Sequence, residues 1–225
     1  MKKTTTGSML VMAALLIASG ALSACNYLAP ASYILEGTGT TPAEHTLDQV
    51  ETLVFVDDAT NVLPRTLLRS ALATDISNDL MARMLVSGTV SPNDAMAMVR
   101  SRERNGRRMS IEAIASEVGV TQLVFLEMES FSLTERQYIP RPNASCFVKV
   151  LCMTRGERVY PADALGDQGG RRISVTMREI PPETMRSASG RRQAQMALAA
   201  DLAGEVAKLF YDHETKELGE NLGIK

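Results

Sequence analysis

Apolar side chains recur along this chain at two spacings, which separate predicted strands from predicted helices. The run VETLVFVDD at residues 50–58 is rich in β-branched and aromatic residues and is typical of a buried strand. Residues 65–86 carry apolar side chains every three or four positions, which predicts an amphipathic helix. Its buried stripe is expected to consist of Leu68, Leu72, Ile76, Leu80 and Met84.

The rest of the chain predicts a second set of helices and strands. Ser91 and Pro92 are typical of a helix start, and this helix leads into the basic loop at 100–108. Ser110 caps a short helix that ends at Gly119, where a left-handed residue is needed. The remaining strands are predicted at 120–133, 143–154 and 172–180, with a hairpin turn at 154–160 and a final helix at 188–213.

This order of elements predicts an α/β or α+β fold with a mixed sheet of about four to six strands and helices packed mainly on one face. We assign residues 48–213 to a single domain and residues 214–225 to a C-terminal tail. Residues 26–47 mix Pro, Gly, Thr and Ala without periodicity, so residues 25–47 are interpreted as a tether.

The first 24 residues have the plan of a secretory signal peptide. Lys2 and Lys3 provide a positive start, and an apolar run over residues 9–22 ends in the small residues Ser23 and Ala24. The run is too short to span a bilayer as a stable helix, which needs roughly 20 apolar residues.

Leu22-Ser23-Ala24-Cys25 resembles the lipobox of bacterial lipoproteins. The resemblance implies cleavage between Ala24 and Cys25 and a diacylglyceryl group on the Cys25 thiol, with a further acyl chain on the new amino terminus. Two or three chains hold a protein at a membrane, since each buried methylene contributes about 0.8 kcal/mol. In that family, aspartate after the cysteine favours the inner membrane; Asn26 therefore implies the outer membrane, facing the periplasm. The alternative is an ordinary secretory peptide with an accidental cysteine.

The amino-acid composition and net charge indicate which classes of partner this protein can bind. Loss of residues 1–24 leaves 22 basic against 26 acidic side chains, a formal charge of −4, and the chain has no Trp. Nucleic-acid binding is therefore not expected. We interpret the basic clusters at 100–108, 171–172 and 191–192 as solvated loops, with contact to anionic lipid head groups as the alternative. The expected partners are a membrane, reached through the anchor, and another envelope protein, with the oligomeric state left open.

Asp57 and Asp58 are the candidate site, because they follow the first predicted strand at its carboxyl end. They predict either a ligand or metal site or, as the simpler interpretation, a turn-forming acidic pair. His45 lies in the predicted tether and His213 at the end of the last predicted helix, so neither indicates a catalytic or zinc site. We expect no cofactor and no enzymatic activity.

Cys146 and Cys152 lie six positions apart in a predicted strand, which separates them by roughly 20 Å. A disulfide requires Cα atoms within about 7 Å. We therefore predict two buried thiols on one face of the strand rather than a bridge.

Residues 50–135 resemble periplasmic α/β domains in having a helix with Ile114 and Ala115, then Gly119, then a strand. The similar families are the curli-export lipoproteins and the amino-terminal domain of the Tol-system propeller protein. Both handle protein partners and assemblies, although the pore-forming hairpins of the first have no counterpart here, so a channel is not expected.

The function that follows is a lipid-anchored, non-enzymatic domain that binds a partner or serves as a scaffold. The alternative is an anchored hydrolase that acts on an envelope polymer through acid/base carboxylates. The carboxylates considered for that chemistry are Asp57, Glu127 and Glu129.

Overall fold

The computed structural model describes residues 39–102, 109–134, 140–163 and 169–215. The chain divides into two units, of which Pro42–His213 forms the α/β body and the other contains the two ends of the chain. The predicted signal peptide, Cys25 and the tether up to residue 38 lie outside the described residues.

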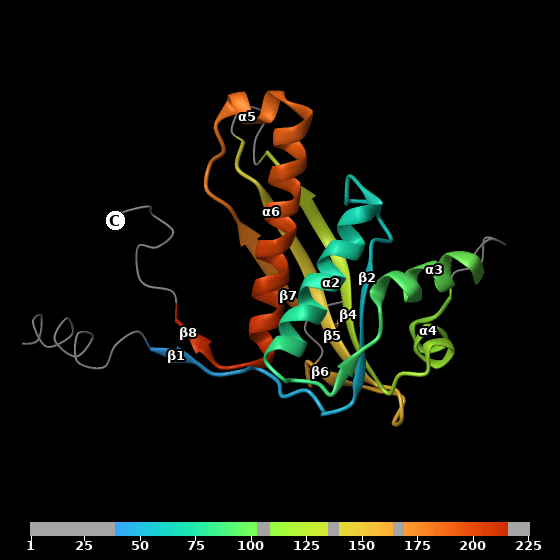
Figure 1. Ribbon diagram of the computed structural model, residues 1–225. Helices are drawn as coiled ribbons and strands as arrows, with labels where there is room; N and C mark the ends of the chain where they lie inside the picture. The colour runs from blue at the N-terminus through green and yellow to red at the C-terminus, as the bar shows by residue number, and fades with distance from the viewer. Residues whose placement is uncertain (1–38, 103–108, 135–139, 164–168, 216–225) are drawn as a thin grey trace, which may run out of the picture. The chain divides into compact units, whose positions relative to one another are not determined.

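The body is built on one mixed sheet. Its strands are β2 (Glu51–Asp57), β3 (Gly88–Thr89), β4 (Gln122–Ser132), β5 (Asn143–Cys152), β6 (Glu157–Tyr160) and β7 (Arg171–Thr176). The six strands run in the order β3-β2-β4-β5-β6, and β7 also pairs with β5 (Figure 1). β2 is parallel to β3 and β4, whereas β5 is antiparallel to β4, β6 and β7. The predicted mixed sheet is confirmed.

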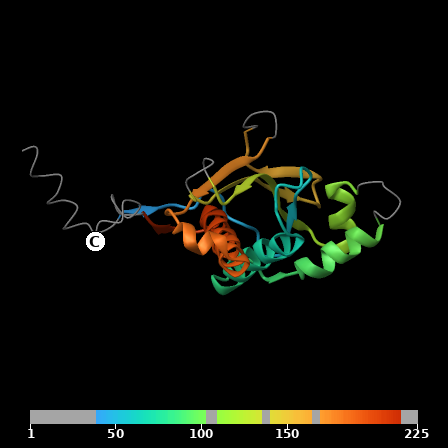
Figure 2. The ribbon, with the colours of Figure 1, turned by 90° about the horizontal axis from the view of Figure 1, so that it is seen from above.

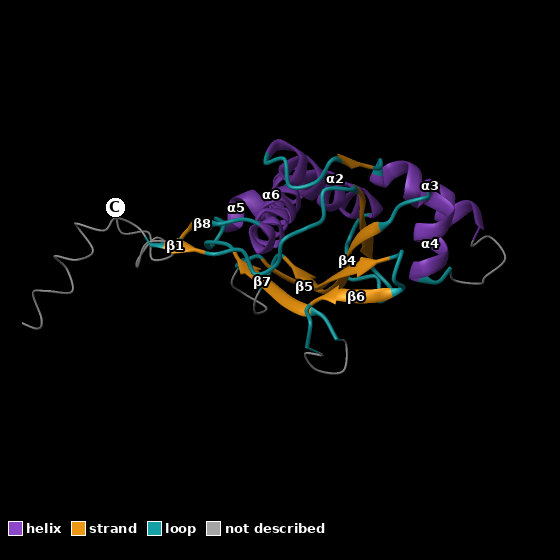
Figure 3. Cartoon of the chain, turned by 90° about the horizontal axis from the view of Figure 1, so that it is seen from below, coloured by secondary structure: helices purple, strands orange, loops and turns teal. Residues whose placement is uncertain are grey.

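Helices lie against this sheet. They are α2 (Thr66–Ala82), α3 (Pro92–Arg102), α4 (Ile111–Val118), α5 (Pro182–Arg186), α6 (Ala188–Ala207) and the short 3-10 turn η2 (Lys208–Phe210). α2 packs on α6 and β2, and α6 packs on β5 and β7. Figures 2 and 3 show α2 and α6 together on one side of the strands. α3 contacts α2, β2 and α4 at the end of the sheet where β2 lies.

The predicted apolar stripe of α2 is buried except at its last member. Leu68, Leu72, Ile76 and Leu80 are at most 1% exposed, but Met84 is 79% exposed. The helix ends at Ala82 and not at residue 86 because Met84 adopts a left-handed backbone with φ of 57°. The amide N–H groups of Leu85 and Met84 donate to the carbonyls of Leu80 and Met81, at 2.9 and 3.0 Å, which closes a Schellman motif.

The predicted ends of α4 are confirmed. The Ser110 hydroxyl accepts a hydrogen bond from the Ala113 amide at 3.2 Å, and Gly119 has a left-handed φ of 81°. The chain then enters β4, the strand expected after this glycine.

The predicted tether extends too far along the chain. The amide N–H groups of Glu44 and His45 donate to the Leu209 carbonyl at 2.9 and 3.1 Å, and Leu47 is only 4% exposed. Residues 42–47 therefore belong to the body. The contacts that hold this segment have no periodicity that a sequence pattern detects.

The final helix is shorter than predicted. It ends at Ala207, and His213 lies in β8 (His213–Glu214), which pairs with β1 (Thr40–Thr41). In the unit that contains the chain ends, the Thr215 amide donates to the Gly39 carbonyl at 2.6 Å. Within the described part of the chain, no helix has the length and apolar character needed to cross a membrane.

Candidate functional site

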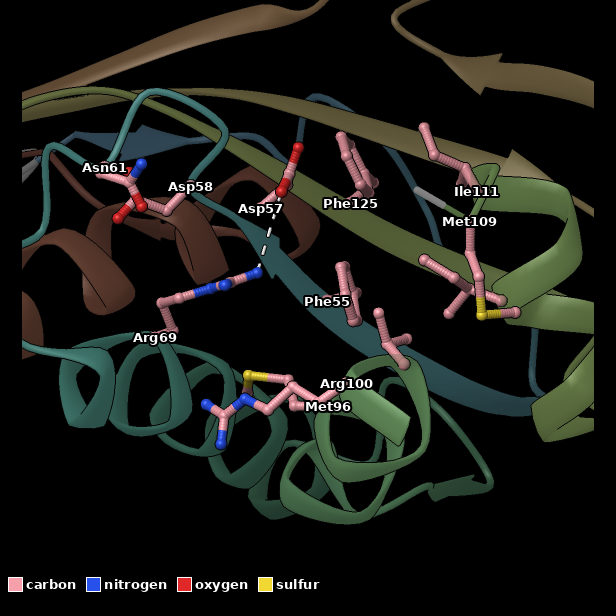
Figure 4. Close-up of a pocket in the computed structure, with 12 residues that line it drawn as sticks. Phe55, Asp57, Asp58, Asn61, Arg69, Met96, Arg100, Met109, Ile111 and Phe125 are labelled. Carbon is pink, nitrogen blue, oxygen red and sulfur yellow. Dashed lines mark ion pairs between the residues drawn. The ribbon is translucent and has the colours of Figure 1, made fainter. Parts of the chain in front are cut away.

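A cavity of about 180 Å³ lies between β2, β4, α3 and α4 (Figure 4). β2 and β4 are adjacent parallel strands in which Phe55 is in register with Phe125, so both rings project from the same face. Their centroids are 6.2 Å apart with an angle of 12° between the ring planes. This ring pair forms one wall of the cavity.

The other walls are apolar side chains of the two helices. α3 supplies Met96 and Val99, and α4 supplies Ile114, all of them buried. Met109 and Ile111 complete the apolar part and are half-buried. α3 and α4 therefore contribute hydrocarbon and thioether groups to the walls of the cavity.

The rim of the cavity is polar. Asp57, at the carboxyl end of β2, lines it together with Arg69 from α2 and Arg100 from α3. Arg69 donates through Nε and Nη2 to the Val56 carbonyl, at 3.2 and 2.9 Å, and its Nη2 lies 3.8 Å from Asp57 Oδ1. Arg100 is exposed, and within the described residues its guanidinium has no hydrogen bond or ion pair.

Asp58 has a different role from its neighbour. Its side chain is buried, and its two carboxylate oxygens accept hydrogen bonds from the amides of Val62 and Leu63, at 2.8 and 3.1 Å. These bonds hold the loop after β2, in which Asn61 has a left-handed φ of 53°. The acidic pair is thus divided: Asp58 closes the loop, and Asp57 lines the cavity.

The carboxylates considered for hydrolysis are separately ion-paired. Glu127 lies 3.2 Å from Lys149 Nζ, and Glu129 lies 2.6 Å from Arg172 Nε. A hydrogen bond from Ser145, and secondly the Arg172 guanidinium, lower the pKa of Glu129 below its ordinary value. Of these three residues, Asp57 lines the cavity. Among the described residues, no three His, Cys, Asp or Glu side chains come together as candidate metal ligands.

A second polar cluster, which the sequence analysis missed, joins residues 42–47 to the sheet. Tyr160 donates to Glu44 Oε2 at 2.6 Å, and Arg171 donates through Nε and Nη2 to the two Glu44 oxygens, at 2.9 and 2.7 Å. His45 stacks on the Tyr160 ring at 5.1 Å, and burial lowers the pKa of its imidazole. We name Glu44, His45, Tyr160 and Arg171 the clasp. Its two parts, residues 44–45 on one side and Tyr160 and Arg171 on the other, are more than 100 positions apart in the chain, so no local signal indicated it.

Cys146 and Cys152 are both free, as predicted. Cys146 is buried, and burial raises the pKa of its thiol to about 12, so the unreactive thiol form prevails at neutral pH. Cys152 is only half-buried, which differs from the prediction of two buried thiols, because it lies at the end of β5.

Comparisons with known proteins give distant structural likenesses. No protein-family model matches the chain, and no curated protein matches it. Similar solved structures include the PelC dodecamer from Paraburkholderia phytofirmans, with a TM-score of 0.40, 12% identity and coverage of 78% of this chain and 97% of that chain. Lipoprotein GNA1162 from Neisseria meningitidis has a TM-score of 0.38 at 9% identity and covers 70% of this chain and 96% of its own. Protein XCC0632 from Xanthomonas campestris has a TM-score of 0.42 at 10% identity, with coverages of 75% and 84%. Since these TM-scores are below 0.5, the likenesses assign no site or role to this chain.

Proposed function

We propose that this chain is a bacterial envelope lipoprotein, anchored through acyl chains on Cys25, whose α/β body binds another envelope protein and catalyses no reaction. The anchor is supported by the resemblance of residues 22–25 to the lipobox. The binding role is supported above all by one observation: on its outer edge, β7 has no partner strand among the described residues.

β7 lies at the border of the sheet. It pairs with β5 from Arg171 to Thr176, and no other described strand pairs with it. Its last four residues, Ile173 to Thr176, combine two β-branched apolar residues with Ser and Thr and contain no proline, lysine or acidic residue. Edge strands that stay unpaired are usually short or carry such protective residues. Arg171 and Arg172, at the start of β7, are charged and are ion-paired with Glu44 and Glu129. The part of the edge without protective residues is therefore Ile173 to Thr176, where an extended segment from a partner protein would gain main-chain hydrogen bonds.

The edge is tested with a photo-crosslinking side chain in the lipidated, full-length protein in intact envelopes. Ser174 is the site of choice, because its side chain is exposed and a strand added beside β7 lies about 5 Å away. Asp201, exposed on α6, is the matched control. We expect a discrete light-dependent adduct from Ser174 and none from Asp201. Adducts of equal yield at both positions, or none from Ser174, would contradict the proposed binding edge. Co-expression of two differently tagged copies shows whether the cross-linked partner is a second copy of this chain or a different protein.

The anchor is tested separately by growing cells with labelled palmitate. We expect label on the wild-type chain, loss of label in Cys25→Ala and no loss in Cys152→Ala. A wild-type protein that carries no label would exclude the lipoprotein assignment and, if residues 1–24 are removed, leave secretion as the alternative. A wild-type protein that retains residues 1–24 would exclude both.

A further inference from the structure

We propose that the cavity between β2, β4, α3 and α4 binds a small organic anion, namely a monocarboxylate that carries one aromatic ring or a short branched hydrocarbon group. This inference goes beyond partner binding and does not depend on the β7 edge. It rests on the size of the cavity, the chemistry of its walls and the charge at its rim.

The size of the cavity suits about one ring with a short substituent. The cavity measures about 180 Å³, and an apolar protein cavity of about 150 Å³ is known to accept benzene. The stacked rings of Phe55 and Phe125 offer a third ring either face or edge contacts. The Met96 thioether can adjust to the outline of such a group, because methionine is flexible and polarisable.

The cavity has opposite chemical character at its two sides. Figure 4 shows the side chains of Arg69 and Arg100 on one side and those of Met109 and Ile111 on the other. A ligand that matches both sides has an apolar body and a charged or strongly polar head. This is the general form of specific small-molecule sites, in which a few polar groups orient a ligand held by apolar walls.

The charge at the rim selects an anionic head. Asp58 is also at the rim, but its carboxylate is occupied by the amides of Val62 and Leu63. Asp57 has the Arg69 guanidinium beside it at 3.8 Å. Arg100 adds a second guanidinium, which has no ion pair among the described residues. A guanidinium binds a carboxylate through two parallel hydrogen bonds, so Arg100 is the residue that we assign to the head group.

The test uses three probes of matched shape and different charge: phenylacetate, 2-phenylethanol and phenethylamine. Binding to the full lipidated chain in nanodiscs is measured by ligand-observed NMR, with empty nanodiscs as the blank. We expect phenylacetate to bind at least about ten-fold more tightly than phenethylamine, with the alcohol between them, because only the anion forms charge-assisted hydrogen bonds with Arg100.

Three substitutions test whether the probes bind in this cavity. Arg100→Gln should weaken phenylacetate at least about ten-fold and leave the neutral alcohol within about two-fold, since it removes the charge and spares the apolar walls. Arg192→Gln removes the same charge from an exposed position of α6 outside the cavity and should have no effect. Val99→Phe should abolish binding of all three probes by filling the cavity; a melting temperature near that of the wild type shows that this variant is folded.

Three results would overturn the proposal: no binding of any probe, equal affinities for the anion and the cation, or unchanged phenylacetate binding in Arg100→Gln. Arg100→Gln substitutes an exposed side chain and should fold, so this outcome does not depend on whether Val99→Phe folds. None of these results would affect the palmitate or cross-linking tests of the proposed function.

Discussion

The parallel and antiparallel halves of the sheet are built differently. In β2, every residue from Thr52 to Val56 is buried, and β4 begins with five buried residues. In β7, half-buried and exposed residues alternate along all six positions. Parallel strands are normally covered on both faces, whereas antiparallel strands can keep one face in water. The two halves of this sheet follow that rule within a single domain.

The two proposed binding regions lie in different halves of the sheet. The parallel half, with α3 and α4 packed near it, encloses the cavity of Phe55 and Phe125. The antiparallel half ends in β7, whose outer edge has no partner strand among the described residues. Enclosure suits a small ligand, and an open edge suits a polypeptide. The following substitutions test how far the halves differ, beginning with the largest expected effect.

Truncation in the parallel half should cost the most stability. Leu53 of β2 is fully buried, so Leu53→Ala should lower the free energy of unfolding by about 3 kcal/mol. Val175 of β7 is half-buried, and Val175→Ala should cost only about 1 kcal/mol. Urea denaturation of both variants measures the difference. Equal losses would mean that the two halves contribute alike to stability.

Asp58 should stabilise the parallel half through its loop. Asp58→Ala removes the acceptor of two amide hydrogen bonds, one of them buried and the other part-buried, and should cost about 2 kcal/mol. Asp201→Ala, at an exposed position of α6, should change stability by less than about 0.5 kcal/mol. Thermal unfolding without added metal is the measurement; a loss at Asp58 that appears only when a divalent metal is present would indicate a metal ligand instead.

The clasp should make the antiparallel half sensitive to acid. Hydrogen bonds from Arg171, and also from Tyr160, lower the pKa of Glu44 in the folded protein. The stabilisation is therefore present above the ordinary carboxyl pKa of about 4.3 and is lost as the pH falls through the lowered folded value. Since Glu44 is 40% exposed, Glu44→Gln should cost about 1 kcal/mol at pH 7.

The difference between wild type and Glu44→Gln should shrink below about pH 4, as measured by urea denaturation across pH. Glu157→Gln is the control in the same half, because its ion pair with Arg155 is more than half exposed on both sides and should contribute little. A constant difference from pH 7 to pH 3 would show that the Glu44 charge does not stabilise the clasp.

The smallest expected effect is at Met84, between α2 and β3 in the parallel half. A left-handed backbone costs a residue other than glycine about 1–2 kcal/mol, while glycine loses about 0.5–1 kcal/mol more chain entropy on folding. Met84→Gly should therefore stabilise the protein by roughly 0.5 kcal/mol. Met84→Ala keeps the strain and should show no gain, which separates the backbone effect from loss of the exposed side chain.

The two helix ends show how far local sequence could predict this fold. At α4, Gly119 supplies the residue that a left-handed end requires, and the predicted end is correct. At α2, the same backbone conformation occurs at a methionine, so the apolar spacing carried the predicted helix too far. The bonds that close this end belong to a motif which the sequence does not mark with glycine.

Other features were outside the reach of any local pattern. Asp57 and Asp58 were the candidate site of the sequence analysis, and their adjacency did not reveal that one closes a loop and the other lines a cavity. Arg69, Arg100 and the two rings meet from four different elements. The clasp joins residue 44 to residues 160 and 171, across most of the chain.

The sequence by itself determined the signal-like start, the lipobox resemblance, the order of the longer strands and helices and the absence of a disulfide between Cys146 and Cys152. These depend on residue types at short spacing, where periodicity and backbone geometry act directly. Only the tertiary structure decided which strand is left at an edge, which charges lie together at a cavity rim and where the tether joins the body. Those features arise when segments that are distant in the chain pack together and exclude water between them. Which side chains come into contact then depends on their positions in the folded structure and not on their spacing in the sequence.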